Sequence, residues 1–302
     1  MNKLLFIYII FCYLLASIFT LQNSISIENQ LIGCLSLIIL FGIPHGAIDN
    51  VLSLSESSLS KKGFYSLYLL SMIFYAALWF IVPIFSFIFF LFLSSYHFGE
   101  SQLSNYNIKN IFSKIIYLVW GISLMSTLFF YNSNELIILF NNFNDTSNFN
   151  IIFDYFLLDI LFYFSNASFI LILIFLKLQN YINRQIFNSE LFQILLLHIT
   201  FYIFPVIISF TLYFVFLHSI KVLVQEYSYL DQKFNGLSLI KFIQLLVPFT
   251  LIALFFFILF IFISNYYELN ISLLLFSIIG ISVITLPHSI SMTNFYNKLN
   301  KL

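Results

Sequence analysis

Long, uninterrupted apolar runs are the feature of this sequence that most limits its fold. Ten runs can be placed, at residues 4–21, 31–49, 64–82, 84–99, 112–131, 152–176, 189–204, 206–223, 239–263 and 271–288. A helix of about 20 apolar residues crosses the hydrocarbon core of a bilayer and pairs all of its own backbone groups. The runs do not alternate apolar and polar residues, as strands of a membrane barrel do. The sequence therefore predicts an all-α, polytopic bundle of about 8–10 transmembrane helices.

The composition excludes several other classes of protein. Only 8% of the residues are charged and 61% are hydrophobic, whereas roughly 25% of the residues in a soluble domain are charged. Basic and acidic residues balance to a net charge of zero, so no basic surface exists to bind nucleic acid. We expect one integral-membrane domain over residues 1–302, with the lipid bilayer as its surroundings.

The basic residues predict how the chain crosses the membrane. All twelve Lys and Arg residues lie in or next to alternate connections or near the ends of the chain, for example Lys3, Lys61, Arg184 and Lys298. The connections between them, such as 22–30, 132–150 and 265–270, carry none. Because cytoplasmic loops are enriched in Lys and Arg, ten helices with both termini in the cytoplasm place every basic residue on one side. The expected location is the inner (plasma) membrane of the cell.

Two features leave the helix count open. Pro83 and Pro205 are the only breaks between two pairs of short runs, so each pair could instead be one broken or re-entrant element, which would give eight helices. The first run, from Leu4 to Leu21, is longer than the 7–15 apolar residues of a secretory signal. We interpret it as a helix that is retained.

Four of the five histidines are predicted to lie at one depth in the membrane. His45, His97, His218 and His288 fall near the cytoplasmic ends of the second, fourth, eighth and tenth runs. Each lies in a short cluster of small or polar residues: GIPHGAID, SSYHFGES, FLHSIK and LPHSIS. Histidines that project from several helices at one depth can form a metal site inside a bundle. An all-imidazole set suits Fe, Zn, Cu or Ni rather than Mg or Ca.

The residues around these histidines refine the prediction. Asp49 follows His45 by four residues and Glu100 follows His97 by three, so both carboxylates could accept hydrogen bonds from metal-bound imidazoles. Two glycines and two prolines in the clusters, Gly46, Gly99, Pro44 and Pro287, are expected to let the helix ends open and the backbones come close. His198 lies in LLLHITFY without a polar neighbour in sequence, which is typical of a histidine that links helices by hydrogen bonds.

The four clusters resemble the Brp/Blh family of membrane β-carotene 15,15′-dioxygenases. PHGAID, YHFGES, LHSIK and TLPH match the family in order and spacing, from about Gly42 to Met292. The resemblance implies a non-haem Fe(2+) enzyme that uses O2 to split the central double bond of β-carotene. Two all-trans-retinal molecules result, and they typically supply a microbial rhodopsin. His45, His97 and His218 match the family's iron ligands.

This sequence departs from the family pattern in the third cluster. Val222 stands where the family has a histidine one helical turn after His218. Either His288 completes the metal shell, or three histidines suffice, or this member is impaired in turnover. The alternative function is therefore a non-catalytic carotenoid- or retinal-binding factor that assists rhodopsin assembly. A haem-b electron carrier would need a facing pair of axial histidines, and these histidines could supply one pair.

Overall fold

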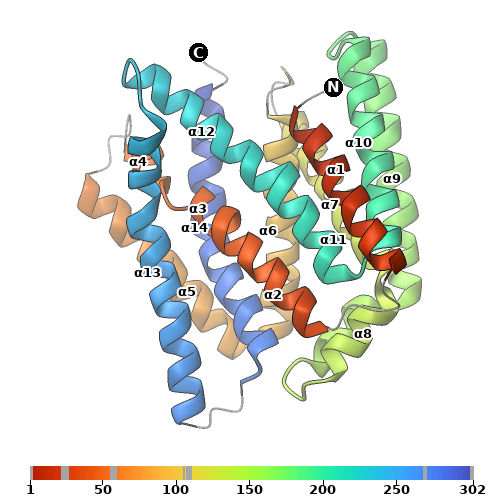
Figure 1. The fold of residues 1–302 in the computed structure, drawn as a ribbon. Coiled ribbons are helices and arrows are strands. Elements are labelled where there is room, and N and C mark those ends of the chain that lie inside the picture. The colour runs from red at the N-terminus through yellow and green to blue at the C-terminus, as the bar shows by residue number, and fades with distance from the viewer. Residues whose placement is uncertain are drawn as a thin grey trace. The chain divides into compact units, whose positions relative to one another are not determined.

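The computed structural model describes residues 3–21, 27–54, 60–104, 106, 111–267 and 271–299. Every regular element in these residues is a helix (Figure 1). In chain order they are α1 Lys3–Leu21, α2 Ile27–Leu37, the π-helix η1 Ile38–Gly42, α3 Ile43–His45, α4 Asp49–Leu54, α5 Lys61–Ile81, α6 Pro83–Leu103, α7 Ile111–Tyr131, α8 Ser133–Asn141, the 3-10 helix η2 Ser147–Phe153, α9 Tyr155–Leu178, α10 Arg184–Ile203, α11 Val206–Leu212, the π-helix η3 Tyr213–Ser219, α12 Ile220–Lys233, α13 Leu239–Tyr266 and α14 Leu273–Leu299.

The structure confirms an all-α, polytopic architecture. Within the described residues, nine helices are long and apolar enough to cross a membrane, and each coincides with one of the second to tenth predicted runs. The first run forms the shorter apolar helix Lys3–Ile18. Separate long helices lie on both sides of Pro83 and of Pro205, which favours two spans rather than one broken element at each proline. Lys109, Lys301 and the terminal Leu302, which bear on the predicted orientation, lie outside the described residues.

The chain divides into two compact units, each built from three segments. The first unit comprises Met1–Gly42, Ser95–Ile138 and Ile152–Val222, and the second comprises Ile43–Ser94, Leu139–Ile151 and Leu223–Leu302. In the first unit, α7 packs along α9 and α10, which are labelled beside one another in Figure 1. In the second unit, α14 packs against α4 and α5, while α13 packs against α3.

Two glycines allow α6 and α7 to approach each other closely in the first unit. A Cβ atom added to Gly99 would collide with the backbone carbonyl of Tyr117, and one added to Gly121 would collide with the carbonyl of Ser95. Small residues at facing positions let membrane helices pack backbone to backbone. Gly99 follows His97 by two residues, so this contact fixes the segment that carries the histidine. The close backbone approach expected at Gly99 is confirmed. The expectation that Gly99 opens a helix end is wrong, because α6 continues from Pro83 to Leu103.

We expect Gly99→Ala to reduce the yield of folded protein severely. Its methyl group would meet backbone rather than a side chain that can move, and overpacking of this kind costs about 3 kcal/mol or more. Gly33→Ala is the matched control, because no atom lies within 4 Å of the Cβ position at Gly33 and alanine favours a helix more than glycine does. Size-exclusion chromatography and the melting temperature of both variants test the prediction. A Gly99→Ala protein as stable as Gly33→Ala would contradict it.

Candidate metal centre

His45 lies in the second unit at a break in its helix. The short helix α3 ends at His45, and residues 46–48 form turns before α4 begins at Asp49. The sequence predicted this opening from Pro44 and Gly46, and the structure confirms it here. At the other proline cluster the prediction is wrong, since α14 runs without interruption through Pro287.

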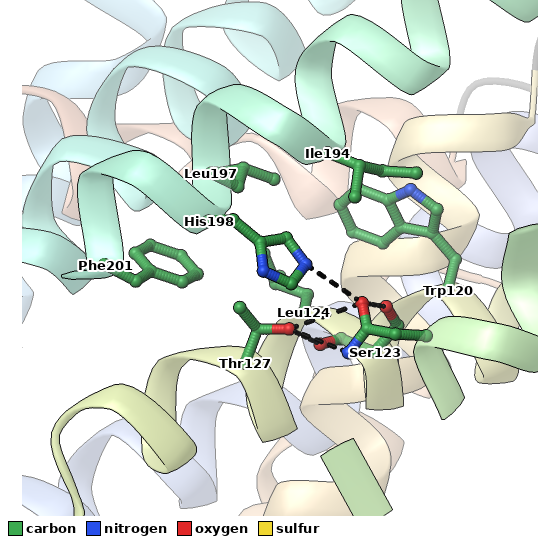
Figure 2. Close-up of a pocket in the computed structure, with 9 residues that line it drawn as sticks. Trp120, Ser123, Leu124, Thr127, Ile194, Leu197, His198 and Phe201 are labelled. Carbon is green, nitrogen blue, oxygen red and sulfur yellow. Dashed lines mark hydrogen bonds between the residues drawn. The ribbon is translucent and has the colours of Figure 1, made fainter. Parts of the chain in front are cut away.

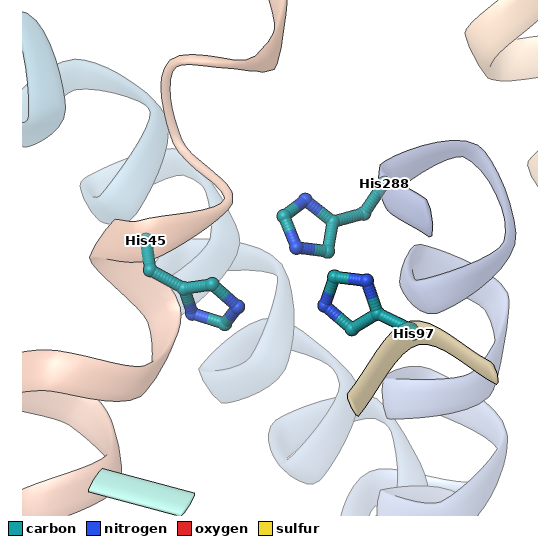
Figure 3. A group of neighbouring side chains, drawn as sticks. All are labelled: His45, His97 and His288. Carbon is teal, nitrogen blue, oxygen red and sulfur yellow. The ribbon is translucent and has the colours of Figure 1, made fainter. Parts of the chain in front are cut away.

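The break places His45 beside His288, which lies on α14 of the same unit (Figure 3). The ring centroids are 4.8 Å apart and the rings are nearly perpendicular, at 88°. Both side chains are buried. Gly46 lies against the His288 ring: a Cβ added at Gly46 would be 3.4 Å from Nδ1 of His288. The PHGA and TLPH clusters therefore bring two buried imidazoles together. Their histidines, 45 and 288, are 243 positions apart in the sequence.

Asp49 orients the His288 ring. Both of its carboxylate oxygens lie 3.0 Å from Nδ1 of His288, and the hydroxyl of Tyr68 donates to Oδ2 at 3.0 Å. A carboxylate accepts hydrogen bonds, so a ring that donates to it from Nδ1 keeps Nε2 for another partner. A carboxylate that holds one nitrogen in this way is the usual partner of a metal-binding histidine. Sequence spacing assigned Asp49 to His45, whereas its hydrogen bond is to His288.

The first unit brings together the other two histidines. His97, on α6, and His218, on η3, have ring centroids 4.9 Å apart at an angle of 78°, and both are buried. Phe98 packs edge-on against the His218 ring, and Phe214 stacks on it. The lining of this pair is thus aromatic and apolar. His218 lies within a π-helical segment, an irregularity that is frequent at functional sites.

The other predicted residues have different surroundings. Glu100 is buried and accepts a hydrogen bond from Tyr96, one turn earlier on α6, at 3.0 Å. The predicted bond between Glu100 and His97 stays a prediction. Tyr68, which holds Asp49, was missed because its role depends on contacts between separate helices. Nothing in the sequence sets it apart from Tyr65 and Tyr75 in the same apolar run.

His198 lies in the first unit, in a polar cluster of its own (Figure 2). Its Nε2 lies 3.2 Å from Oδ1 of Asn166, and its Nδ1 lies 3.1 Å from the hydroxyl of Tyr131. Asn166 also accepts from Ser123 and donates to Thr127. The histidine thus links α10 to α7 and α9 by hydrogen bonds, as a helix-linking histidine would.

The fold and the two histidine pairs define a helical membrane protein with buried imidazole sites. Residues 36–296 match the family model described as beta-carotene 15,15'-dioxygenase, and the chain belongs to this family. Neither the curated proteins nor the solved structures include a match to the chain. The match covers all four histidine clusters, so the family suggested by the sequence is confirmed.

Proposed function

We propose that this protein cleaves the central 15,15′ double bond of β-carotene with O2 to give two all-trans-retinal molecules. The carbon–carbon double bond breaks, and each oxygen atom of O2 becomes the aldehyde oxygen of one product. The family match supports the substrate and the reaction. The observation that carries the proposal is the pairing of four buried histidines from four separate clusters.

We infer that the cofactor is Fe(2+). The four proposed ligand histidines are His45, His97, His218 and His288. Buried neutral imidazoles fit iron in their donor chemistry, and the Asp49 hydrogen bond gives His288 the tautomer that a ligand needs. Val222 is fully buried and apolar, so it cannot replace the family histidine, and we assign the fourth position to His288.

The chain's own residues would hold the substrate and the ligands in place. Ferrous iron, when bound, supplies the chemistry that lets O2 react with a carbon–carbon double bond. Asp49 and Tyr68 keep the His288 ring in one orientation. Phe98, Tyr213 and Phe214 form an aromatic surface around His218. An apolar polyene dissolved in the bilayer can contact such a surface without entering water.

The cellular setting follows from the same proposal. Nine apolar helices in the part of the chain that the structure describes suit a multi-pass protein, and we propose the plasma membrane as its location. The retinal that it forms would then supply a retinal-binding rhodopsin in the same membrane.

Expression in a β-carotene-producing bacterium tests the proposed function. We expect bleaching of the cells and accumulation of retinal, measured by chromatography of lipid extracts, against an empty-vector control. Purified protein that retains intact β-carotene and forms no retinal would contradict the proposal and favour a carotenoid-binding assembly factor. A haem absorption band in the purified protein would favour an electron carrier instead.

A further inference from the structure

A buried polar network lies in the first unit, next to the His97 and His218 segments. The ammonium group of Lys221 donates to Oε1 of Gln102 at 2.9 Å and to the Gln102 backbone carbonyl at 3.3 Å. The amide of Gln102 then donates to Oε1 of Glu190 at 2.9 Å and to Oε1 of Gln193 at 3.0 Å. Tyr106 donates to the same oxygen of Glu190. Gln102 and Glu190 are buried, and Lys221 and Tyr106 are half-buried.

The hydrogen bonds of this network all run in one direction. Lysine only donates and an ionised glutamate only accepts, whereas a glutamine amide does both. Gln102 therefore bridges the amino group of Lys221 and the carboxyl group of Glu190. Burial and the charge of Glu190 raise the pKa of Tyr106, so this hydroxyl keeps the hydrogen that it donates. A buried ion pair is tolerated only when such bonds satisfy both partners.

Gln102 and Lys221 both lie close in sequence to a proposed ligand histidine. Gln102 follows His97 by five residues on α6, and Lys221 follows His218 by three residues at the start of α12. Glu190 lies on α10, so the network fastens both histidine-bearing segments to a third helix. Gly99 fixes the same part of α6 against α7. The helical segments that carry His97 and His218 are thus fixed by the polar network and by the packing of α6 on α7.

We propose that the Lys221–Gln102–Glu190 network is a positioning device that sets the separation of the His97 and His218 rings. The role of this separation in metal binding rests on the proposed function. Loss of the bridge would let α6 and α12 move apart and would misplace both imidazoles. Residues that support metal ligands in this way typically change metal affinity by 10–100-fold.

Cobalt binding to the purified full-length protein tests the positioning role. Co²⁺ is titrated into protein in lipid nanodiscs, and its visible absorption reports both affinity and ligand geometry. We expect Gln102→Leu and Lys221→Met to bind Co²⁺ at least about 10-fold more weakly, with altered bands. Lys221→Arg should bind Co²⁺ more tightly than Lys221→Met, because arginine keeps the positive charge and the hydrogen-bond donors. Gln232→Leu is the matched control, since Gln232 is exposed on α12.

A second variant covers the case in which Lys221→Met fails to fold. The double variant Lys221→Met/Glu190→Gln removes both buried charges together, so no ion is left without its partner. It should fold and still bind Co²⁺ weakly, because the bond from Lys221 to Gln102 is gone. If the folded Gln102→Leu protein or the double variant binds Co²⁺ with wild-type affinity and spectrum, the positioning role is wrong. The proposed function would not be affected by that result. If the wild-type protein neither binds Co²⁺ nor forms retinal, both this inference and the proposed function are wrong.

Discussion

Alanine in place of any one of the four proposed ligand histidines is expected to abolish retinal formation in β-carotene-producing cells. Each substitution removes an imidazole from a buried position. Loss of an outer partner of a metal ligand already costs 10–100-fold in affinity or activity, so loss of a ligand should cost at least about 100-fold. Retinal per milligram of membrane-inserted protein is the measurement, with iron content measured in parallel.

His198→Ala is the matched control for these four variants. The imidazole of His198 bonds to Asn166 and Tyr131, and hydrogen bonds between membrane helices contribute about 0.6 kcal/mol on average. This variant should therefore be slightly less stable yet keep most of its iron and activity. Near-normal retinal from one of the four alanine variants would remove that histidine from the metal site. For His288 this result would also end its assignment as the replacement for the family histidine absent at Val222.

The second large effect is expected from Asp49→Asn. The substitution keeps the size of the side chain but removes the charge that makes His288 a better donor to a metal. The amide can also turn its NH2 toward the ring and favour the wrong tautomer. We expect metal binding to weaken by 10–100-fold, measured by competition with a chelator of known affinity.

Asp159→Asn provides the control for Asp49→Asn, because Asp159 is an exposed acid on α9. Tyr68→Phe should have a smaller effect in the same direction, since it removes one donor to the carboxylate but leaves the charge. Unchanged metal affinity in the folded Asp49→Asn protein would show that the carboxylate does not support a ligand.

Much of the fold could be predicted because a membrane-spanning helix is encoded locally. The length and polarity of each apolar run determine whether a helix can span the bilayer, and nine of the predicted runs are such helices in the described residues. The turn after His45 was also predictable, from Pro44 and Gly46. Pro287 was not, because α14 accommodates its proline without ending. Neighbouring helices can compensate for a proline within the membrane, and sequence patterns do not contain that information.

The site was predictable in its histidines but not in their partners. Four clusters of unusual polarity in apolar runs marked the histidines directly. Asp49, however, bonds to His288, which is 239 residues away, whereas the four-residue spacing pointed to His45. Gln102 and Glu190 are 88 residues apart, and nothing near either residue signals the other. Such pairs arise from the packing of separate helices, which helical periodicity within one run does not specify.

The iron content of the purified wild-type protein tests the central claim most directly. We propose that His45, His97, His218 and His288 are the ligands of this iron. Elemental analysis of protein purified from iron-supplied cells, set against its concentration from amino-acid analysis, gives the number of ions per chain. We expect one iron per chain, lost in each of the four alanine variants. Two ions per chain would show that each pair binds its own metal, and active protein without iron would show that iron is not the cofactor.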